Sequence, residues 1–188
     1  AEQQPSQSFS KGDKSANLDT MYQSLEEFVD YVKSTYPQIQ LEAAILDFNH
    51  LKSSFQNTNG VDFEIRKGIY GFSPMFLSKD GKDTSSFNGT GFSALKMENP
   101  LYKYGSIDTL LKQSVEQLHT QNIKDKFVGQ IVVTPDCIGD FLGFITSDIS
   151  DGKMISGNSL YKEKLNEQIT HPKLTFHSRP VSEEIVDG

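Results

Sequence analysis

The tetrapeptide NTNG at residues 57–60 separates stretches with the short period of β-strands. An Asn-Gly pair in this setting is a strong hairpin signal, because both residues tolerate the positive φ of a type I′ turn. Before the turn, QIQLEAAILDF and HLKSSFQN are predicted to form two strands. After it, VDFEIRKGIYGFSPMFLS is predicted to form a third. This arrangement commits residues 38–78 to antiparallel pairing.

A second turn, SKDGKD at residues 78–83, leads into TSSFNGTGFSALKM, which is predicted to be a fourth strand. Glycines in strands mark bends or close approaches of the backbone. The third and fourth predicted strands carry four of them: Gly68, Gly71, Gly89 and Gly91. The central part of the chain is therefore predicted to be an antiparallel β-meander.

Helices are predicted on both sides of the meander. The first ends at Pro37, and its apolar residues recur at helical spacing. They are Leu18, Met21, Tyr22, Leu25, Phe28, Val29, Val32 and Tyr36. The second, SIDTLLKQSVEQLHTQ, follows a predicted linker at residues 99–106 and has Ser106 as its cap. Its inward residues are predicted to be Ile107, Leu110, Leu111, Val115 and Leu118.

A boundary between modules is predicted near residues 124–126. Beyond it, FVGQIVVT is expected to be a buried strand, and TPDCIGDFLGFITSDI a helix with Thr134 as cap and Pro135 at its first position. The loop SDGKMISGN, a helix over SLYKEKLNEQI and a strand over LTFHS complete the prediction. The apolar face expected to pack the first of these helices consists of Ile138, Phe141, Leu142, Ile145 and Ile149.

These elements predict an α+β fold. A flexible, polar lead-in (residues 1–17) precedes a helix-flanked antiparallel β-meander (18–122), and the start of a second α+β module follows (127–188). The chain begins at Ala1 and stops at Gly188, and we expect it to be a fragment of a longer protein.

Composition bears on the class of partner. The net charge is −7, and the two arginines are Arg66 and Arg179. Phosphate neutralisation needs clustered Lys and Arg, so a direct nucleic-acid partner is not expected. The sequence has no apolar stretch long enough for a bilayer, and its N-terminus does not resemble a signal peptide. A single cysteine, Cys137, fits a reducing compartment, so a cytoplasmic location is expected.

Candidate catalytic chemistry is sparse. A zinc hydrolase helix of the HExxH kind needs two His and a Glu, whereas the helix at 136–149 has neither residue type. Its titratable groups are Asp136, Asp140, Asp148 and Cys137. We assign Asp136 to the helix dipole, Asp148 to solvated surface and Cys137 to apolar filling.

Other patterns are interpreted as structural. SGNS at 156–159 is a helix cap and not a nucleophile elbow, and GTG at 89–91 lacks the context of a phosphate loop. The chain has four histidines, and His119 is expected at the surface. His171 and His177 bracket PKLTF and in principle could meet a metal with Glu183 or Glu184, although roughly 20 Å of strand would separate them. We predict no catalytic, cofactor-binding or metal-ligating residue in this chain.

The order of these segments resembles the TldD/PmbA family. SSFQNTNGVDFEIRKGIYGFSPMFLSKDGKDTSSFNGTGFSA is similar to its central part, with an "sN-t-nG" turn and a Gly-aromatic strand. FVGQIVVTPDCIGDFLGFITSDISDGKMISGNSLYKEKLNEQITHPKLTF is similar to the start of its last domain. One departure is Leu165–Asn166–Glu167, where the family usually has Leu-Gly-Glu, so the local backbone is expected to differ.

The resemblance implies a function. TldD-like members carry a HExxxH metal motif on the helix that aligns with residues 142–147, which read LGFITS here. The chain thus resembles PmbA-like members, which lack the motif and pair with a motif-bearing partner. Such pairs form a cytosolic metallopeptidase for unfolded peptides, linked to trimming of a microcin precursor and to DNA gyrase control. Zinc is accordingly expected in the partner subunit and no cofactor in this chain.

Three hypotheses follow. The first is a non-catalytic subunit that shapes the peptide channel and stabilises a TldD-like partner, with strand addition as one mode of peptide contact. The second is a metallopeptidase in its own right, using ligands beyond this chain together with His171 or His177. The third is a homodimeric peptide-binding or scaffold protein. The sequence does not name the substrate peptide.

Overall fold

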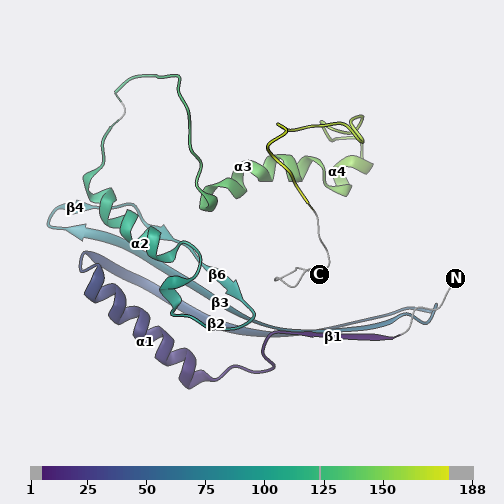
Figure 1. Ribbon diagram of the computed structural model, residues 1–188, viewed down its shortest axis with the longest axis horizontal. Coiled ribbons are helices and arrows are strands. Elements are labelled where there is room, and N and C mark those ends of the chain that lie inside the picture. The colour runs from purple at the N-terminus through teal and green to yellow at the C-terminus, as the bar shows by residue number, and fades with distance from the viewer. Residues whose placement is uncertain (1–5, 123, 178–188) are drawn as a thin grey trace. The chain divides into compact units, whose positions relative to one another are not determined.

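The computed structural model describes residues 6–122 and 124–177 of the chain (Figure 1). The chain divides into two compact units, residues 1–122 and 123–188. The first unit holds a six-stranded sheet with helices, and the second holds helices α3 and α4. The α+β class predicted from the sequence is confirmed.

The predicted hairpin forms the two long strands of the first unit. β2 (Ile39–Gln56) and β3 (Asp62–Asp80) pair antiparallel along their length, from Ile39 opposite Ser78 to Gln56 opposite Asp62. Two strands were predicted before the turn, but β2 is continuous. Asn49, which lies between the two predicted strands, keeps its place in the ladder opposite Ile69. The register shifts once, between Leu41 and Ala43.

The turn at residues 57–60 closes the hairpin by a different geometry from the one predicted. Gly60 has a positive φ of 80°, whereas Asn166 is the single non-glycine residue with positive φ in the described ranges, so Asn59 does not adopt the type I′ conformation. The Asn57 side chain instead accepts hydrogen bonds from the backbone N–H groups of Asn59 (2.9 Å) and Val61 (3.2 Å). An Asx-type turn built by Asn57 therefore replaces the type I′ turn.

β3 is the central strand because it is paired on both sides. Opposite β2 it pairs with β4 (Asp83–Thr84), β5 (Asn88–Gly89) and β6 (Phe92–Ala94), all antiparallel. The predicted fourth strand is thus split into three short ones. The predicted antiparallel meander is confirmed in this part of the sheet.

A parallel strand extends the sheet beyond the meander. β1 (Gln7–Lys11) lies beside β3, with Phe9 opposite Ile65 and Ser10 opposite Arg66. These residues belong to the segment predicted as a flexible lead-in, which is wrong for residues 7–11. The free edge of β3 satisfies the backbone of this polar segment, and its alternating Ser and Phe suit the two faces of a sheet.

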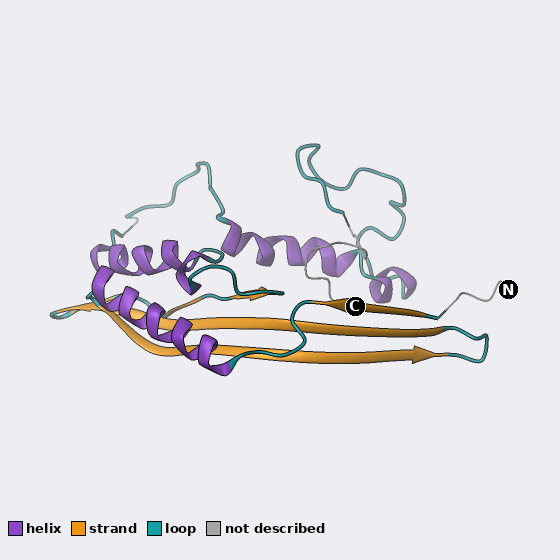
Figure 2. Cartoon of the chain, turned by 60° about the horizontal axis from the view of Figure 1, so that its bottom comes forward, coloured by secondary structure: helices purple, strands orange, loops and turns teal. Residues whose placement is uncertain are grey.

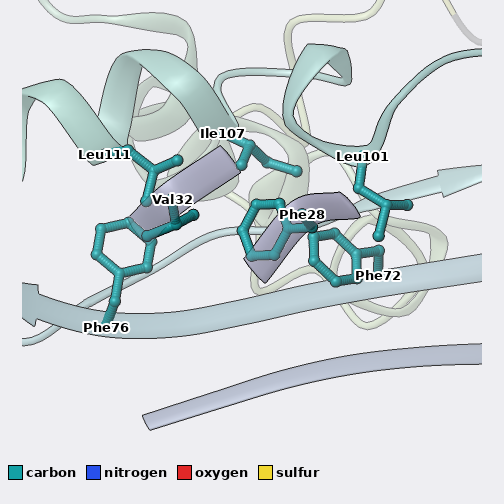
Figure 3. Close-up of a cluster of buried hydrophobic side chains, with 7 residues drawn as sticks. All are labelled: Phe28, Val32, Phe72, Phe76, Leu101, Ile107 and Leu111. Atoms are coloured by element: carbon teal, nitrogen blue, oxygen red, sulfur yellow. The ribbon is translucent and has the colours of Figure 1, made fainter. Parts of the chain in front are cut away.

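One face of the sheet is covered by α1 (Leu18–Thr35) and α2 (Ile107–Glu116). The buried core between them is shown in Figure 3 and consists of Phe28, Val32, Phe72, Phe76, Leu101, Ile107 and Leu111. The Asn17 side chain caps α1 by accepting from the N–H groups of Asp19 and Thr20. Of the apolar positions predicted for this helix, Leu18 and Tyr22 are exposed, so its buried stripe is narrower than predicted.

The predicted linker at residues 99–106 contributes one residue, Leu101, to the buried core. It contains the short helix η1 (Leu101–Lys103), whose Leu101 is fully buried. In α2, Ile107 and Leu111 are buried as predicted, while Val115 is only partly buried. The next fully buried position is Ser114, whose hydroxyl contacts those of Ser78 (2.9 Å) and Ser85 (3.2 Å). The short helix η2 (Gln117–His119) follows α2.

The strands β2 and β3 run well past the two helices and end in a narrow extension that β1 joins (Figure 2). We call this extension the arm; it comprises residues 7–11, 49–56 and 62–69. Helices α1 and α2 do not cover the two faces of the arm.

The second unit contains α3 (Pro135–Asp148) and α4 (Asp151–Ile155). The helix predicted after Pro135 is confirmed, and α4 occupies part of the predicted loop. No strand forms between residues 124 and 177, so the strand predicted over FVGQIVVT is absent. The strand predicted over LTFHS is also absent in its described part, residues 174–177, and Ser178 lies outside the described residues. Residues 159–169 form turns instead of the predicted helix. A strand needs a neighbour for its N–H and C=O groups, and the described part of this unit supplies none.

Candidate functional site

Residues 142–147, which the resemblance places at the HExxxH motif and which we call motif-aligned, lie in α3. Residues 142–147 are fully helical and carry the side chains of LGFITS. Leu142 and Ile145 are partly buried, whereas Phe141, Ile138 and Ile149 are exposed, so the apolar face predicted for this helix is only half covered. No described element of the second unit lies over the exposed half of that face.

A cavity of about 460 Å³ opens beside this part of α3. Its walls are provided by α3, by Lys153 of α4 and by the turn that contains Leu160 and Tyr161. Gly143, Phe144 and Ser147, all within the motif-aligned segment, line it. The volume lies within the range of typical small-ligand pockets, about 300–1,000 Å³. The motif-aligned face of α3 therefore borders a space large enough for one or two amino-acid side chains.

The Asp148 side chain connects the segments that line this cavity. Its Oδ1 accepts a hydrogen bond from Lys153 Nζ at 2.6 Å, and its Oδ2 accepts one from the backbone N–H of Leu160 at 3.2 Å. The hydrogen bond from Lys153, followed by that from Leu160, lowers the pKa of the carboxyl group below its usual value. The prediction that Asp148 is solvated surface is wrong, because its side chain is 14% exposed and joins α3 to the following turn.

The SGNS segment caps a helix, but at the opposite end from the one predicted. Gly157 has a positive φ of 72° and follows α4, and the N–H groups of Asn158 and Ser159 bond back to the carbonyl of Lys153. This is the arrangement of a C-terminal cap. Ser159 is buried, and its Oγ accepts a hydrogen bond from the N–H of Tyr161 at 2.9 Å.

Asn166, at the position where the resemblance expects a glycine, has an unusual backbone conformation. Its φ is 65°, in the left-handed region that glycine adopts most readily. Asparagine is one of the few other residues that tolerate this region. The expectation that the local backbone differs from that of the family's Leu-Gly-Glu stays a prediction.

The residues of α3 do not fit a zinc site. Zinc in proteins is held by at least three His, Cys, Asp or Glu side chains that converge within about 2.3 Å of the metal. Within residues 6–122 and 124–177, no three such side chains converge. Of the described acidic and thiol groups on α3, Asp140 and Cys137 are exposed, and both oxygens of Asp148 accept hydrogen bonds from Lys153 and Leu160. The side chain of Asp136 lies outside the described part.

The histidines are dispersed. His171 lies in a tight turn, where its Nδ1 accepts from the N–H of Lys173 at 3.2 Å, and His177 is exposed. The glutamates proposed as their co-ligands, at positions 183 and 184, lie outside the described residues. His119 is exposed at the end of η2, as predicted, and His50 lies on the arm.

The sheet has an open face opposite its helices. The strand registers place five exposed large apolar side chains on it, each between 40% and 58% exposed: Phe9, Ile45, Leu51, Phe55 and Met75. Exposed apolar patches of this kind commonly mark contacts between proteins. Sequence periodicity alone did not show this face, because its members come from three strands and are brought together by the register.

The sheet also has an open edge. β2 pairs with β3 on one side, and within the described residues no strand pairs with its other side. Its 18 residues therefore present a long row of backbone donors and acceptors, the kind of edge to which an extended peptide can add as a further strand. No described helix is both long and apolar enough to cross a membrane.

A comparison with protein-family models gives a match that lies in the second unit. Residues 128–187 match the family model described as the PmbA/TldA metallopeptidase C-terminal domain. Comparisons with curated proteins and with solved structures give no match. The matched range includes α3, the cavity beside it and the turn that contains Asn166.

Proposed function

We propose that the chain is a non-catalytic, PmbA-like subunit of a metal-dependent peptidase complex that acts on unfolded or leader peptides, because residues 128–187 match the C-terminal domain of the PmbA/TldA metallopeptidases. The observation that carries this proposal is the composition of the cavity beside α3. At the positions aligned with HExxxH, its wall is formed by Gly143, Phe144, Ile145 and Ser147, none of which supplies a metal ligand or a general base.

The cavity is suited to holding part of a peptide. Phe144, Ile145 and Leu160 give it apolar walls, and Asp140 and Lys153 add polar groups. Such a mixture binds an apolar side chain while leaving backbone amides a polar partner. In this role the chain positions substrate, and the motif-bearing subunit carries the metal. A bound zinc ion in that subunit would supply an activated water for amide hydrolysis.

The first unit provides features that suit a subunit of a complex. The open sheet face carries Phe9, Leu51 and Phe55, and burial of such side chains is the usual source of affinity between obligate partners. The outer edge of β2 is a second contact surface, suited to an extended peptide. We assign the open face to the motif-bearing subunit and the edge to substrate.

Co-expression of the complete protein with a HExxxH-bearing relative from the same genome tests the partnership. The expected result is a mixed complex on size-exclusion chromatography, with both chains in a fixed ratio. Leu51→Lys together with Phe55→Lys should weaken it at least tenfold, because two charges would have to be buried. Tyr22→Lys, at an exposed position of α1, is the matched control and should leave assembly unchanged.

Recovery of homodimers alone, with the relative unbound, would contradict the partnership and favour a homodimeric peptide-binding or scaffold protein. A metallopeptidase acting on its own would instead require stoichiometric zinc in the complete protein, lost on His171→Ala or His177→Ala. These three outcomes are distinguishable in one set of preparations by chromatography and by metal analysis.

A further inference from the structure

The first unit has a hollow where the loop after β1 crosses the arm. Its volume is about 220 Å³. It is lined on one side by Ser10, Lys11, Asp13 and Lys14, and on the other by His50, Lys52 and Arg66. The register brings these side chains together, since Lys52 lies opposite Arg66 and Ser10 lies opposite Arg66 on its other side.

The hollow is cationic in an acidic chain. Four of its lining residues, Lys11, Lys14, Lys52 and Arg66, carry positive charge, and one, Asp13, carries negative charge. The whole chain has a net charge of −7. A local reversal of sign in a concave site concentrates anions there and directs their approach.

The loop that forms one wall is held rigidly. A Cβ atom on Gly68 would lie 1.8 Å from the carbonyl oxygen of Asp13, and one on Gly12 would lie 2.0 Å from the carbonyl oxygen of Gly68. The two backbones are therefore in direct contact, and Gly12 also has a positive φ of 73°. The Tyr70 hydroxyl donates to Asp13 Oδ2 at 3.1 Å, which holds the carboxylate of the loop in place.

The arm already binds one carboxylate of its own. Glu64 Oε2 lies 2.7 Å from Lys52 Nζ, and Glu64 Oε1 lies 2.7 Å from Arg66 Nη2. The hydrogen bond from Lys52 lowers the pKa of the Glu64 carboxyl group. Within the described residues, the side chains of Lys14 and His50 have no hydrogen bond or ion pair, so the hollow presents donors that Glu64 does not use.

An adjoining hollow of about 530 Å³ shares Lys14 and His50 with the cationic one. Its other walls include Leu18, Met21 and Phe48. A hollow of 220 Å³ is too small for a complete ligand of typical size but accommodates a single charged group. The pair of hollows therefore fits a negatively charged group attached to an apolar one.

From this geometry we propose that the cationic hollow binds the carboxylate of a peptide whose neighbouring apolar side chain occupies the adjoining hollow. Lys14 contacts the carboxylate from the loop, and His50, Lys52 and Arg66 contact it from the arm. Glu64 competes with the peptide for the two arm cations. This site is separate from the cavity beside α3, and its test measures binding, so its failure would leave the proposed subunit role standing.

Isothermal titration of the full chain with two tripeptides tests the site. N-acetyl-Leu-Asp-Leu-amide should bind about tenfold more tightly than its neutral isostere N-acetyl-Leu-Asn-Leu-amide, because charge-assisted hydrogen bonds are about twice as strong as neutral ones. Inorganic phosphate is the third probe and should bind more weakly than the acidic peptide. Equal affinity for the two peptides, or tighter binding of phosphate, would overturn the assignment.

Two pairs of variants locate the binding. Lys14→Gln should reduce the affinity for the acidic peptide about tenfold, whereas Lys33→Gln, on the exposed side of α1, should not. Glu64→Gln should increase the affinity, since it frees Lys52 and Arg66, and it should do so more than the remote Glu26→Gln. An equal effect of Lys14→Gln and Lys33→Gln, or no gain on Glu64→Gln beyond that of Glu26→Gln, would show that general charge and not this site governs binding.

Discussion

The Asp148 carboxylate accepts a hydrogen bond from Lys153 Nζ at 2.6 Å, and this contact joins the end of α3 to α4. The second oxygen of the same carboxylate binds the N–H of Leu160. One side chain thus positions three segments around the cavity at the motif-aligned face of α3.

Asp148→Asn should loosen the wall of that cavity. An amide keeps one acceptor oxygen but loses the charge that binds both Lys153 and Leu160, so the turn should open more often. Hydrogen exchange of the Leu160 amide should become roughly tenfold faster. Asp140→Asn, at an exposed position on the same helix, is the control. Unchanged exchange at Leu160 in Asp148→Asn would contradict the anchoring role.

Acidification should have the same local effect. The folded-state pKa of Asp148 is lowered from the ordinary value of 3.8, so the contact stabilises the folded state above that value and is lost as pH falls through the lower, folded-state pKa. Exchange at Leu160, corrected for the intrinsic pH dependence, should therefore increase below about pH 3.8 in the native chain but not in Asp148→Asn.

Phe28 is predicted to be a large contributor to the stability of the first unit. Its side chain is fully buried, and its ring lies edge-on to that of Phe72 with the centroids 5.0 Å apart. Phe28→Ala should lower the free energy of unfolding by about 3–5 kcal/mol, measured by guanidinium denaturation. Leu18→Ala, at a residue 77% exposed on the same helix, should change it by about 0.5 kcal/mol or less. Similar effects of both changes would contradict the assignment of the core.

The first unit should lose stability at high pH through two tyrosines. The hydroxyls of Tyr31 and Tyr36 donate to Asp108 Oδ1 at 2.6 and 2.9 Å. Burial, followed by these hydrogen bonds, raises the pKa of both hydroxyls above 10.0. Their contribution is therefore complete below pH 10 and is lost as pH rises towards the folded-state pKa values.

Tyr36→Phe should cost about 1 kcal/mol at neutral pH and make the loss at high pH less steep. Urea denaturation between neutral and alkaline pH measures both effects. Tyr22→Phe is the control, because that side chain is 63% exposed. If the unfolding free energy of Tyr36→Phe fell at high pH as steeply as that of the native chain, Tyr36 would not be responsible for the loss of stability.

Gly68→Ala should separate the loop after β1 from β3. The added Cβ would lie 1.8 Å from the carbonyl oxygen of Asp13. Because this oxygen belongs to the main chain, the clash can be relieved only if the loop or β3 shifts. We expect a loss of about 1–3 kcal/mol in unfolding free energy and faster amide exchange along β1. Gly89→Ala is the control, since its Cβ would meet Pro74 at an ordinary 3.7 Å. Protection of β1 retained in Gly68→Ala would contradict the close packing of the two backbones.

The elements that sequence predicted well are those whose signal is local. The periodicity that ends at Pro37 gave α1, and the turn signal at residues 57–60 gave the hairpin. β1 was not predicted, because four of its five residues are polar and such a segment forms a strand only where a distant edge accepts it. Residues 127–134 have the composition of a buried strand, but no strand forms there. Strand formation depends on a neighbouring strand as well as on propensity.

The sites show the same division. The lack of metal ligands in residues 142–147 was visible in the sequence, while the anchoring role of Asp148 depends on contacts five and twelve residues away. The cationic hollow combines residues from three segments. Part of it could have been predicted by counting back from the turn, because a hairpin closed at residues 57–60 pairs Lys52 with Arg66. The contribution of Lys14 could not, since it depends on the contact between Gly12 and Gly68.

Hydrolysis of an unstructured peptide by the complete protein tests the central claim most directly. The protein alone should release no products with or without a chelator, and addition of the HExxxH-bearing relative should give cleavage that the chelator abolishes. Chelator-sensitive cleavage by the protein alone would contradict a non-catalytic role and would place metal ligands elsewhere in the protein.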